Sequence, residues 1–468
     1  MRQIILVLTF ITTAFLCSAQ DARVHIDSIH IEGNKRTKVR IILRELTFSQ
    51  GDSIPLSIMP SILEQNRLRL MNTGLFLNAK INIKNWTADN HATADIVVTE
   101  NWFIYPIPIF EIADRNFNVW WKEQHHDLRR TNYGMRLTFN NITGRRDPLS
   151  AVVQMGYTPK YSFNYSLPYI NKKQTIGVSF SYYNAVNREV GYTTDSNKIV
   201  FHKNRDKFLQ KREATSTALS YTPGLFTSHA LAVGYSRNRV DTIIANTLNP
   251  DYYLNNHIRQ HYLWMYYSVT YDKRDIRPYP LNGYYFNFYA QKNGFSSKAD
   301  VNTLDVSARF AQYISFSKKW SFETIVKGKT ALIRNKQPYT HLRGLGFGSD
   351  FLRGYEYYVV DGLDFGYAKN SLRFELVNKT YDLRRYARWE KMKSFMELPL
   401  KSYLRLNFDA GYVHNPFATT TNTLANRPLY GGGIGFDLVA YYNMVWRFEY
   451  SFNHLGEKGL YFSYSIGF

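Results

Sequence analysis

The sequence predicts a mainly β protein, in which a 16-stranded antiparallel transmembrane β-barrel follows one small β-α-α-β-β domain. Three observations predict this fold. The chain begins with an export signal, it is rich in aromatic residues yet has no apolar spanning helix, and most of its length consists of short alternating segments.

Residues 1–19 have the pattern of a secretory signal peptide. Arg2 precedes an apolar run from Ile4 to Leu16, and the small residue Ala19 offers a cleavage site. The residue before Cys17 is a leucine, where a lipoprotein signal needs a small residue, so we do not expect a lipid anchor. Because Cys17 is the only cysteine, cleavage after Ala19 would leave no thiol for disulfides, nucleophilic catalysis or metal binding.

The composition excludes a helical membrane protein and favours strands. The chain contains 37 Tyr and 31 Phe among 468 residues, and aromatic residues favour strands and membrane–water interfaces. The mean hydropathy is -0.37, and no segment after the signal reaches the roughly 18 to 20 apolar residues of a spanning helix. An exported chain of this kind is typical of a barrel in the outer membrane of a Gram-negative cell.

The net charge of +21 does not indicate nucleic-acid binding. Lys and Arg are spread over the expected loops rather than gathered in one stripe, and an exported protein rarely meets nucleic acid. We therefore expect outer-membrane lipids and lipopolysaccharide, not nucleic acid, as the anionic partners.

Residues 23–101 form the predicted small domain. Pro55 opens its second amphipathic helix and Gly74 ends it. The five predicted elements, a strand, two helices and two strands, lie near residues 24–31, 39–46, 55–74, 77–83 and 94–98. This order and the strings IHIEGNKRTKVRIILREL and LRLMNTGLFLNAKINI resemble a POTRA domain, the polypeptide-transport-associated module. The alternative is another small domain with two helices and three strands.

Residues 104–468 form the predicted barrel. The last strand shows the alternation, since every second residue from Leu460 to Phe468 is apolar and those between are mostly small or polar. An even number of strands is expected for a closed bacterial barrel. The sixteen predicted strands begin near residues 104, 134, 149, 162, 174, 214, 229, 260, 284, 303, 320, 371, 403, 429, 445 and 459.

The longest gap between predicted strands covers residues 334–370 and contains LRGLGFGSDFLRGYEYYVVDG. Long connections in compact proteins are usually functional or disordered. Within this one, Leu352, Arg353, Gly354 and Tyr355 resemble the lumen-loop motif (V/L-R-G-F/Y) of the BamA/TamA surface-antigen family. The strings YDKRDIRPYPLNGYYF, RLNFDAGYV and YGGGIGFDL and the terminal Phe468 resemble further parts of that family.

The resemblance covers nearly the whole mature chain and implies a function. It implies an outer-membrane protein assembly or translocation factor, with the POTRA domain in the periplasm, that handles unfolded outer-membrane or secreted polypeptides. Accessory lipoproteins are further possible partners. The rival functions are a dedicated secretion pore for one partner protein and a passive outer-membrane channel. The chain has room for one POTRA domain, whereas family members usually carry two or more.

Arg353 needs acidic partners if it is buried in the lumen, because its guanidinium stays charged. Alternation on the twelfth and thirteenth predicted strands places Glu375 and Asp409 on the lumen face. The family resemblance implies the same two residues as partners of the loop arginine. The alternative is that all three are ordinary solvated lumen charges.

The first and last predicted strands meet at the barrel seam, to which we assign Pro106, Pro108, Gly467 and Phe468. A proline cannot donate a ladder hydrogen bond, so this seam is expected to be weakly paired and able to open sideways, consistent with the lateral gate attributed to the family. The alternative places both prolines in a linker before the barrel.

We expect no enzyme, no metal and no cofactor. The sequence has no GxSxG, HExxH or phosphate-binding glycine loop. His125 and His126 are adjacent, so on a strand they would point to opposite faces and could not easily share a metal.

Overall fold

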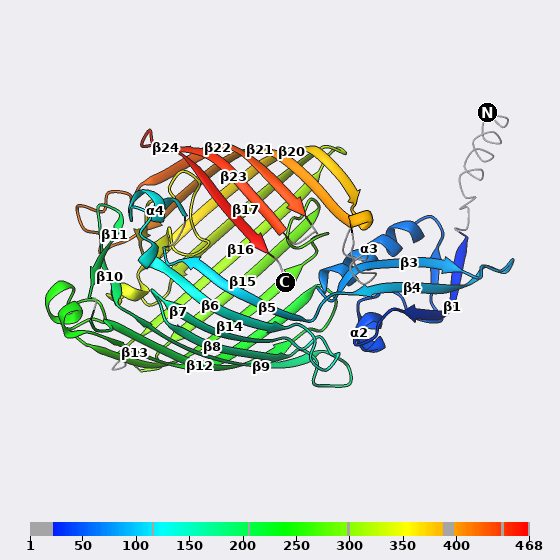
Figure 1. Ribbon diagram of the computed structural model, residues 1–468, viewed down its shortest axis with the longest axis horizontal. Coiled ribbons are helices and arrows are strands. Elements are labelled where there is room, and N and C mark those ends of the chain that lie inside the picture. The colour runs from blue at the N-terminus through cyan, green and yellow to red at the C-terminus, as the bar shows by residue number, and fades with distance from the viewer. Residues whose placement is uncertain are drawn as a thin grey trace, which may run out of the picture. The chain divides into compact units, whose positions relative to one another are not determined.

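The computed structural model describes residues 22–114, 117–204, 206–296, 300–386, 397–440 and 444–466. The chain divides into two compact units, Met1–Asn101 and Trp102–Phe468 (Figure 1). The predicted signal peptide and its Cys17 lie outside the described residues. No helix in the described ranges has the length and apolar character needed to cross a membrane.

The first unit is a four-stranded mixed sheet with two helices. The strand order is β2-β1-β4-β3, with β1 parallel to β4 and the other pairs antiparallel. Its buried core includes Ile26, Ile42, Leu70 and Ile96. The elements are β1 (Arg23–Glu32), α2 (Val39–Arg44), β2 (Ser53–Pro55), α3 (Met59–Asn72), β3 (Phe76–Lys84) and β4 (His91–Glu100).

The start of the second helix differs from the prediction. Pro55 lies in the short strand β2 and pairs with Arg23 of β1, so it does not open a helix. Instead, α3 begins at Met59 and has Pro60 in its first turn, where the missing N–H of proline costs no helical hydrogen bond. The helix ends just before Gly74, whose φ is +74°.

A buried carboxylate ties three strands of the first unit together. Asp95 on β4 accepts from Lys84 of β3 at 2.8 Å and from His30 of β1 at 2.9 Å. These hydrogen bonds, that of Lys84 foremost, lower the pKa of Asp95 below its usual value. The strand order places the three-residue β2 and the nine-residue β3 at the two edges of the sheet.

The second unit is one antiparallel sheet of sixteen strands that curls into a barrel (Figure 1), which confirms the predicted fold class. Every predicted strand has a counterpart. In chain order they are β5 (Ile104–Ile112), β6 (Thr131–Phe139), β7 (Leu149–Gly156), β8 (Lys160–Leu167), β9 (Ile176–Asn187), β12 (Gln210–Tyr221), β13 (Thr227–Val240), β14 (Arg259–Asp272), β15 (Gly283–Asn293), β16 (Thr303–Ser315), β17 (Trp320–Ala331), β20 (Asp364–Asp382), β21 (Glu397–His414), β22 (Pro428–Ala440), β23 (Met444–Asn453) and β24 (Lys458–Ile466).

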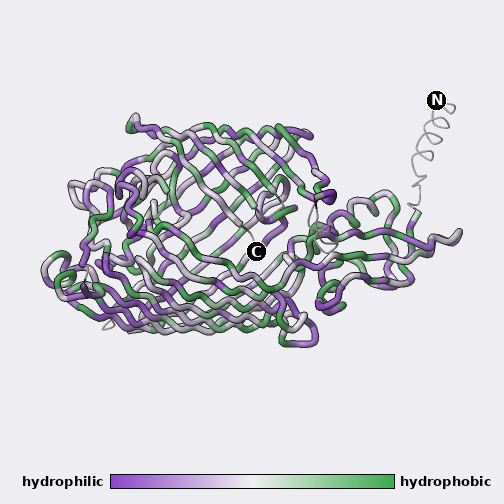
Figure 2. The backbone as a smooth tube through the Cα atoms, viewed as in Figure 1, coloured by the Kyte–Doolittle hydropathy of each residue, from purple (hydrophilic) through white to green (hydrophobic). Residues whose placement is uncertain are grey.

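Alternation along the strands separates an outward apolar face from an inward polar one. On β21, Leu406 and Phe408 are 59% and 57% exposed, whereas Asn407 and Asp409 between and beside them are buried. Figure 2 shows hydrophobic and hydrophilic residues alternating along many barrel strands. The outward apolar face is what a lipid-facing surface requires.

The twelfth strand begins earlier than predicted, so the predicted loop 334–370 is too long at its end. Residues of β20 from Phe365 onward already pair with β17. The reason is an inverted pattern: Phe365 and Tyr367 are buried beneath the preceding loop, while Gly366 between them is exposed. We call the observed connection, residues 332–363, the lumen loop.

The connections are longer at the end of the barrel opposite the start of β5. They hold α4 (Phe117–Lys122), η1 (Leu128–Arg130), the hairpin of β10 (Glu189–Asp195) and β11 (Lys198–Lys203), η2 (Ile243–Leu248) and, in the lumen loop, η3 (Tyr339–His341), β18 (Arg343–Leu345) and β19 (Val360–Asp361). The opposite end holds the short η4 (Arg384–Tyr386). Short turns at one end and long loops at the other are usual in outer-membrane barrels.

Candidate functional site

The lumen loop packs against one side of the barrel interior, formed by the inward faces of β17 and β20 to β23. We call this surface the anchoring wall. Leu352 is 1% exposed and lies in an apolar cluster with loop residues and strand residues. The other buried members of the cluster are Leu345, Tyr355, Val360, Phe365, Tyr367, Val413, Leu424, Ala425 and Leu429.

Arg353 projects from the loop onto Asp409 of β21. Its Nη2 lies 2.7 Å from Asp409 Oδ1, and both its Nε and its backbone N–H donate to Oδ2, at 2.9 and 3.0 Å. Its Nη1 donates to Ser371 Oγ at 2.9 Å. Arg353 is 6% exposed and Asp409 is fully buried. The guanidinium and the carboxylate therefore form a bidentate, charge-assisted ion pair in the protein interior.

Two further arginines on the wall are paired in the same way. Arg405 Nε lies 3.0 Å from Asp437, and its Nη2 lies 2.7 Å from Glu449. Arg373 pairs with Glu323 and donates to the backbone oxygen of Pro280 at 2.7 Å. Each buried guanidinium therefore meets at least one carboxylate, as burial of a charge requires.

The predicted acidic partner Glu375 needs correction. Its carboxylate accepts from Tyr403 at 3.1 Å and from Asn378 at 3.2 and 3.3 Å, and no described contact joins it to Arg353. Arg353 lies beside Ser371, and Glu375 is about 13 Å further along β20 at roughly 3.3 Å per residue. The second carboxylate near Arg353 is Glu449 of β23, at 4.0 Å.

Sequence reasoning missed Glu449, although the signal was present. The segment MVWRFEYSF alternates, and Glu449 falls on the same inward face as Ser451, which is fully buried. The prediction considered only the two strands that follow the loop. Glu449 lies on β23, which is separated from β21 by β22.

Glycines let the loop backbone touch the wall. Gly354 has φ +87°, and a Cβ there would lie 2.5 Å from the backbone oxygen of Phe452. A Cβ on Gly431 would lie 2.0 Å from the backbone oxygen of Arg353. Asn453 then donates to the Gly354 oxygen at 2.7 Å. The backbone of the loop thus packs directly on Gly431 in the glycine-rich segment of β22, a contact that we call the glycine seat.

Tyr355 completes the anchoring of the four-residue motif. Its hydroxyl donates to the Tyr430 backbone oxygen at 3.1 Å, accepts from the Tyr430 N–H at 3.2 Å and hydrogen-bonds His454. The structure thus brings residues 352–355 and Asp409 together, and it places Glu375 elsewhere.

The turn between β14 and β15 also contacts the anchoring wall, through Tyr279. The Tyr279 hydroxyl donates to Asp437 at 2.7 Å, and the ring stacks on Tyr403 with centroids 4.9 Å apart. The Arg373 guanidinium lies 4.7 Å from the centroid of the same ring. The YDKRDIRPYPLNGYYF string therefore contributes a side chain to the charged network.

The seam residues lie at the two outer strands of the sheet. Pro106 and Pro108 are inside β5, opposite Leu137 and Met135 of β6, so they do not belong to a linker before the barrel. Among the described residues, β5 pairs only with β6 and β24 only with β23. The predicted seam residues Gly467 and Phe468 lie outside the described residues.

One group in the first unit has the side chains of a metal site. His25, Asp27 and His91 offer ligand atoms within 4.8 Å of one another. His91 Nδ1 is hydrogen-bonded to Asp27 at 2.7 Å and His25 Nδ1 to Ser53 at 3.2 Å. Asp27 and His91 are exposed and His25 is half-buried, and each already has a protein partner.

Residues 141–373 match the Omp85 superfamily domain. The fold is similar to that of BamA from Haemophilus ducreyi lacking POTRA domains 1–3, with 14% identity, a TM-score of 0.52 and coverage of 95% of this chain and 84% of that one. It is also similar to CdiB from Escherichia coli, with 13% identity, a TM-score of 0.55 and coverage of 95% and 76%. A comparison with curated proteins finds no match.

Proposed function

Because the chain belongs to the Omp85 superfamily, we propose that it is an outer-membrane assembly or translocation factor. In this proposal the N-terminal unit engages unfolded polypeptide and the barrel inserts or exports it, without cofactor, metal or covalent chemistry. The barrel sits in the outer membrane of a Gram-negative cell among phospholipid and lipopolysaccharide, and accessory lipoproteins assist it.

The observation that carries the proposal is the unpaired seam. β5 and β24 are the outer strands of the sixteen-stranded sheet, and the described residues form no ladder between them. Pro106 and Pro108 remove two N–H donors from β5. An outer strand with free backbone groups can template an incoming strand, which is the step that insertion of a client barrel requires.

The N-terminal unit supports client capture by its own edge. We assign it as a POTRA domain in the periplasm. Among the described residues, the outer strand β3 (Phe76–Lys84) pairs with β4 alone. An extended client segment can add to that edge through backbone hydrogen bonds, which select extended shape rather than sequence.

The lumen loop argues against a passive channel. Arg353 and its motif neighbours fix the loop inside the barrel, against the anchoring wall, by a buried ion pair and close backbone contact. A pore would need the loop to leave the lumen, and that would break a buried charge pair. Planar-bilayer recordings of the purified protein should therefore show small or absent currents, whereas steady large pores would favour the channel.

The decisive experiment locks the seam in the native cell. Single cysteines in β5 and β24 are oxidised to a disulfide after the wild-type copy is depleted, and the outer-membrane and secreted proteomes are quantified. The matched control joins β23 to β24 by Phe448→Cys and Phe462→Cys, which are already opposite in the sheet.

Locking the seam should reduce client proteins, reduction of the disulfide should restore them, and the control should have no effect. Loss of many barrels would indicate general assembly, and loss of one or two surface proteins would indicate the dedicated secretion pore. An unchanged proteome with a locked seam would contradict the lateral opening, and an unchanged proteome after depletion alone would contradict the function itself.

A further inference from the structure

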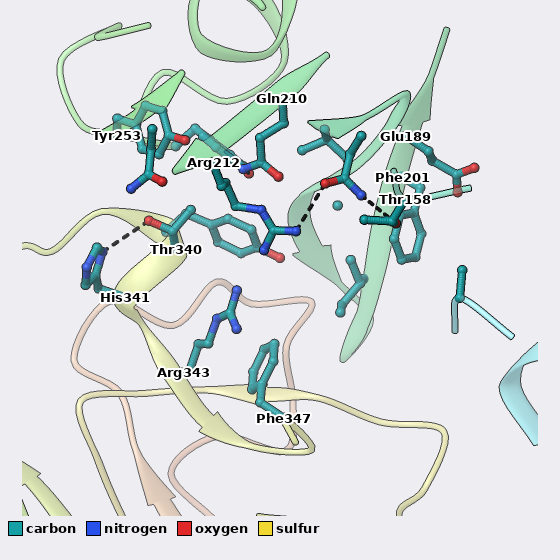
Figure 3. A pocket seen from close by; sticks show the side chains of 18 of the residues that line it. Thr158, Glu189, Phe201, Gln210, Arg212, Tyr253, Thr340, His341, Arg343 and Phe347 are labelled. Atoms are coloured by element: carbon teal, nitrogen blue, oxygen red, sulfur yellow. Dashed lines mark hydrogen bonds between the residues drawn. The ribbon is translucent and has the colours of Figure 1, made fainter. Parts of the chain in front are cut away.

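A second site lies in the barrel interior, away from the anchoring wall. A cavity of ≈ 620 Å³ is lined by β12, β14, the hairpin of β10 and β11, and the lumen loop (Figure 3). None of the paired arginines of the wall contributes to it. The size is that of a pocket for a small organic molecule, since such pockets span roughly 300 to 1,000 Å³.

Two guanidinium groups point toward one another across this cavity. Arg212 projects from β12 and Arg343 from β18 of the lumen loop (Figure 3). Arg212 donates to the amide oxygen of Asn187 at 3.1 Å, and Arg343 lies over the Phe347 ring at 5.3 Å. Within the described ranges neither arginine forms an ion pair, although Asp361 is the register partner of Arg343 in the short β18–β19 ladder.

The contrast with a third arginine of the same cavity is informative. Arg130 pairs with Asp114 at 2.7 Å and with Glu189, so its charge is neutralised within the protein. Arg212 and Arg343 face each other as like charges and form no ion pair within the described ranges, although the carboxylates Asp114, Glu123, Glu189 and Glu213 also line the cavity. An anion held between the two guanidinium groups would remove that repulsion and accept several hydrogen bonds.

A buried amide in the cavity wall also lacks partners. Gln260 of β14 is 0% exposed, and neither its Oε1 nor its Nε2 has a hydrogen-bond partner among the described residues. The Nε of Arg212 is likewise unpartnered. Because a buried polar group without a hydrogen-bond partner is destabilising, a ligand that hydrogen-bonds these atoms would gain binding free energy.

We propose that this cavity binds an organic oxyanion, a carboxylate or a phosphate ester, held between Arg212 and Arg343. The Gln260 amide bonds a neighbouring polar group of the ligand, and the rings of Tyr252, Tyr262 and Phe347 line the space for its carbon skeleton. Aromatic faces beside polar groups suit a ring-shaped or short-chain ligand.

Binding would also fasten the lumen loop to the second side of the barrel. Arg343 belongs to the loop, whereas Arg212 and Gln260 belong to strands β12 and β14. A ligand that contacts all three favours the state in which the loop is inside, and it stabilises that state by mass action. This inference does not require that the protein handle polypeptide clients.

The test uses the full-length protein in detergent micelles at constant ionic strength. Titration calorimetry and thermal unfolding are measured with citrate, inorganic phosphate, glucose 6-phosphate and, as a neutral probe, glucose. We expect saturable binding and a raised unfolding midpoint with at least one anion and no effect of glucose. Stronger binding of citrate would identify a carboxylate ligand, and stronger binding of glucose 6-phosphate a phosphate ester.

Matched variants separate the site from a general salt effect. Arg212→Gln and Arg343→Gln should each weaken binding at least tenfold, as expected for a lost charge-assisted contact worth about 1.4 kcal/mol or more. Arg212→Lys should retain part of the affinity and guards against a folding defect. Arg239→Gln removes the same charge from an exposed position on β13 that does not line the cavity, and it should bind like the wild type.

Equal binding by all variants would overturn the proposal, because the anions would then act by general charge screening. Absence of saturable binding by every anion would also overturn it. As a second readout, protease cleavage within residues 332–363 should slow when the ligand is present, and this protection should vanish in Arg343→Gln.

Discussion

The two sides of the barrel interior share one sheet and one alternating pattern, yet they treat charge differently. On the anchoring wall, Arg353, Arg373 and Arg405 each meet a carboxylate within the protein. In the cavity beside β12 and β14, Arg130 is paired with Asp114 and Glu189, whereas Arg212 of β12 and Arg343 of the loop form no ion pair among the described residues. The anchoring wall holds the loop by buried ion pairs, and the two arginines without ion pairs are the basis for the ligand proposed in the cavity.

Backbone contact separates the two sides as clearly as charge does. Gly354 and Gly431 allow the loop backbone to touch β22 and β23 without intervening side chains. The cavity side instead carries large side chains such as Tyr252, Tyr253 and Tyr262. Close backbone contact fixes the position of the loop. Bulky polar side chains that surround a cavity leave space for a ligand.

The largest expected effect comes from removing the carboxylate under the loop arginine. Asp409→Asn keeps the shape but leaves the buried Arg353 without its main counter-charge. Breaking one partner of a buried pair costs roughly 3 to 5 kcal/mol. The unfolding midpoint should fall, and protease should cleave residues 332–363 faster while the barrel strands stay protected.

The matched control for this prediction is Asp409→Asn combined with Arg353→Met, which removes both charges. Because the double variant leaves no uncompensated buried charge, it should recover much of the stability while the loop stays displaced. If Asp409→Asn alone left both stability and loop cleavage unchanged, the ion pair would not hold the loop.

A smaller effect is expected from filling the glycine seat. In Gly431→Ala the new Cβ would lie 2.0 Å from the Arg353 backbone oxygen, so the loop or the strand must move. Overpacking of this kind costs roughly 1 to 3 kcal/mol. Hydrogen exchange of the loop amides should rise, with the barrel otherwise unchanged.

Gly366→Ala on β20 is the control, because its nearest non-neighbouring atom would be 3.9 Å from the added Cβ. Faster exchange in both variants would mean that any alanine loosens the barrel. Unchanged exchange in Gly431→Ala would mean that the loop backbone does not rest on that glycine.

Much of this architecture could be predicted from alternation alone. The sixteen strands and the inward position of Asp409 follow from the two-residue repeat of a strand. Alternation gives the wrong assignment where the apolar side chains face the protein: Phe365 and Tyr367 are buried under the loop, so the pattern assigns the start of β20 to the loop. Alternation predicts the face of the sheet on which a residue lies, but it does not predict which residue of another segment is its neighbour.

The choice between Glu375 and Glu449 illustrates that limit. Both are inward carboxylates, and the alternation of the twelfth strand together with the family resemblance indicates Glu375. The height of Arg353 in the barrel depends on where the loop descends, and this is fixed by Gly354, Tyr355 and the apolar cluster around Leu352. No local sequence rule encodes that height, and for the same reason the cavity between Arg212 and Arg343 could not be predicted.

The smallest expected effect tests this correction directly. Glu375→Gln removes a carboxylate whose partners are Tyr403 and Asn378, and glutamine can accept both hydrogen bonds. We expect a change in unfolding free energy within about 0.5 kcal/mol, as is usual for substitutions away from buried charge pairs. Loop cleavage by protease should be unchanged.

Glu449→Gln is the matched variant. Glu449 forms an ion pair with Arg405 at 2.7 Å and lies 4.0 Å from Arg353, so this substitution should both destabilise the barrel and expose the loop. Equal effects of the two substitutions would mean that the acidic partners of the loop are not distinguished by their distance from Arg353, and the assignment of Glu449 in place of Glu375 would be wrong.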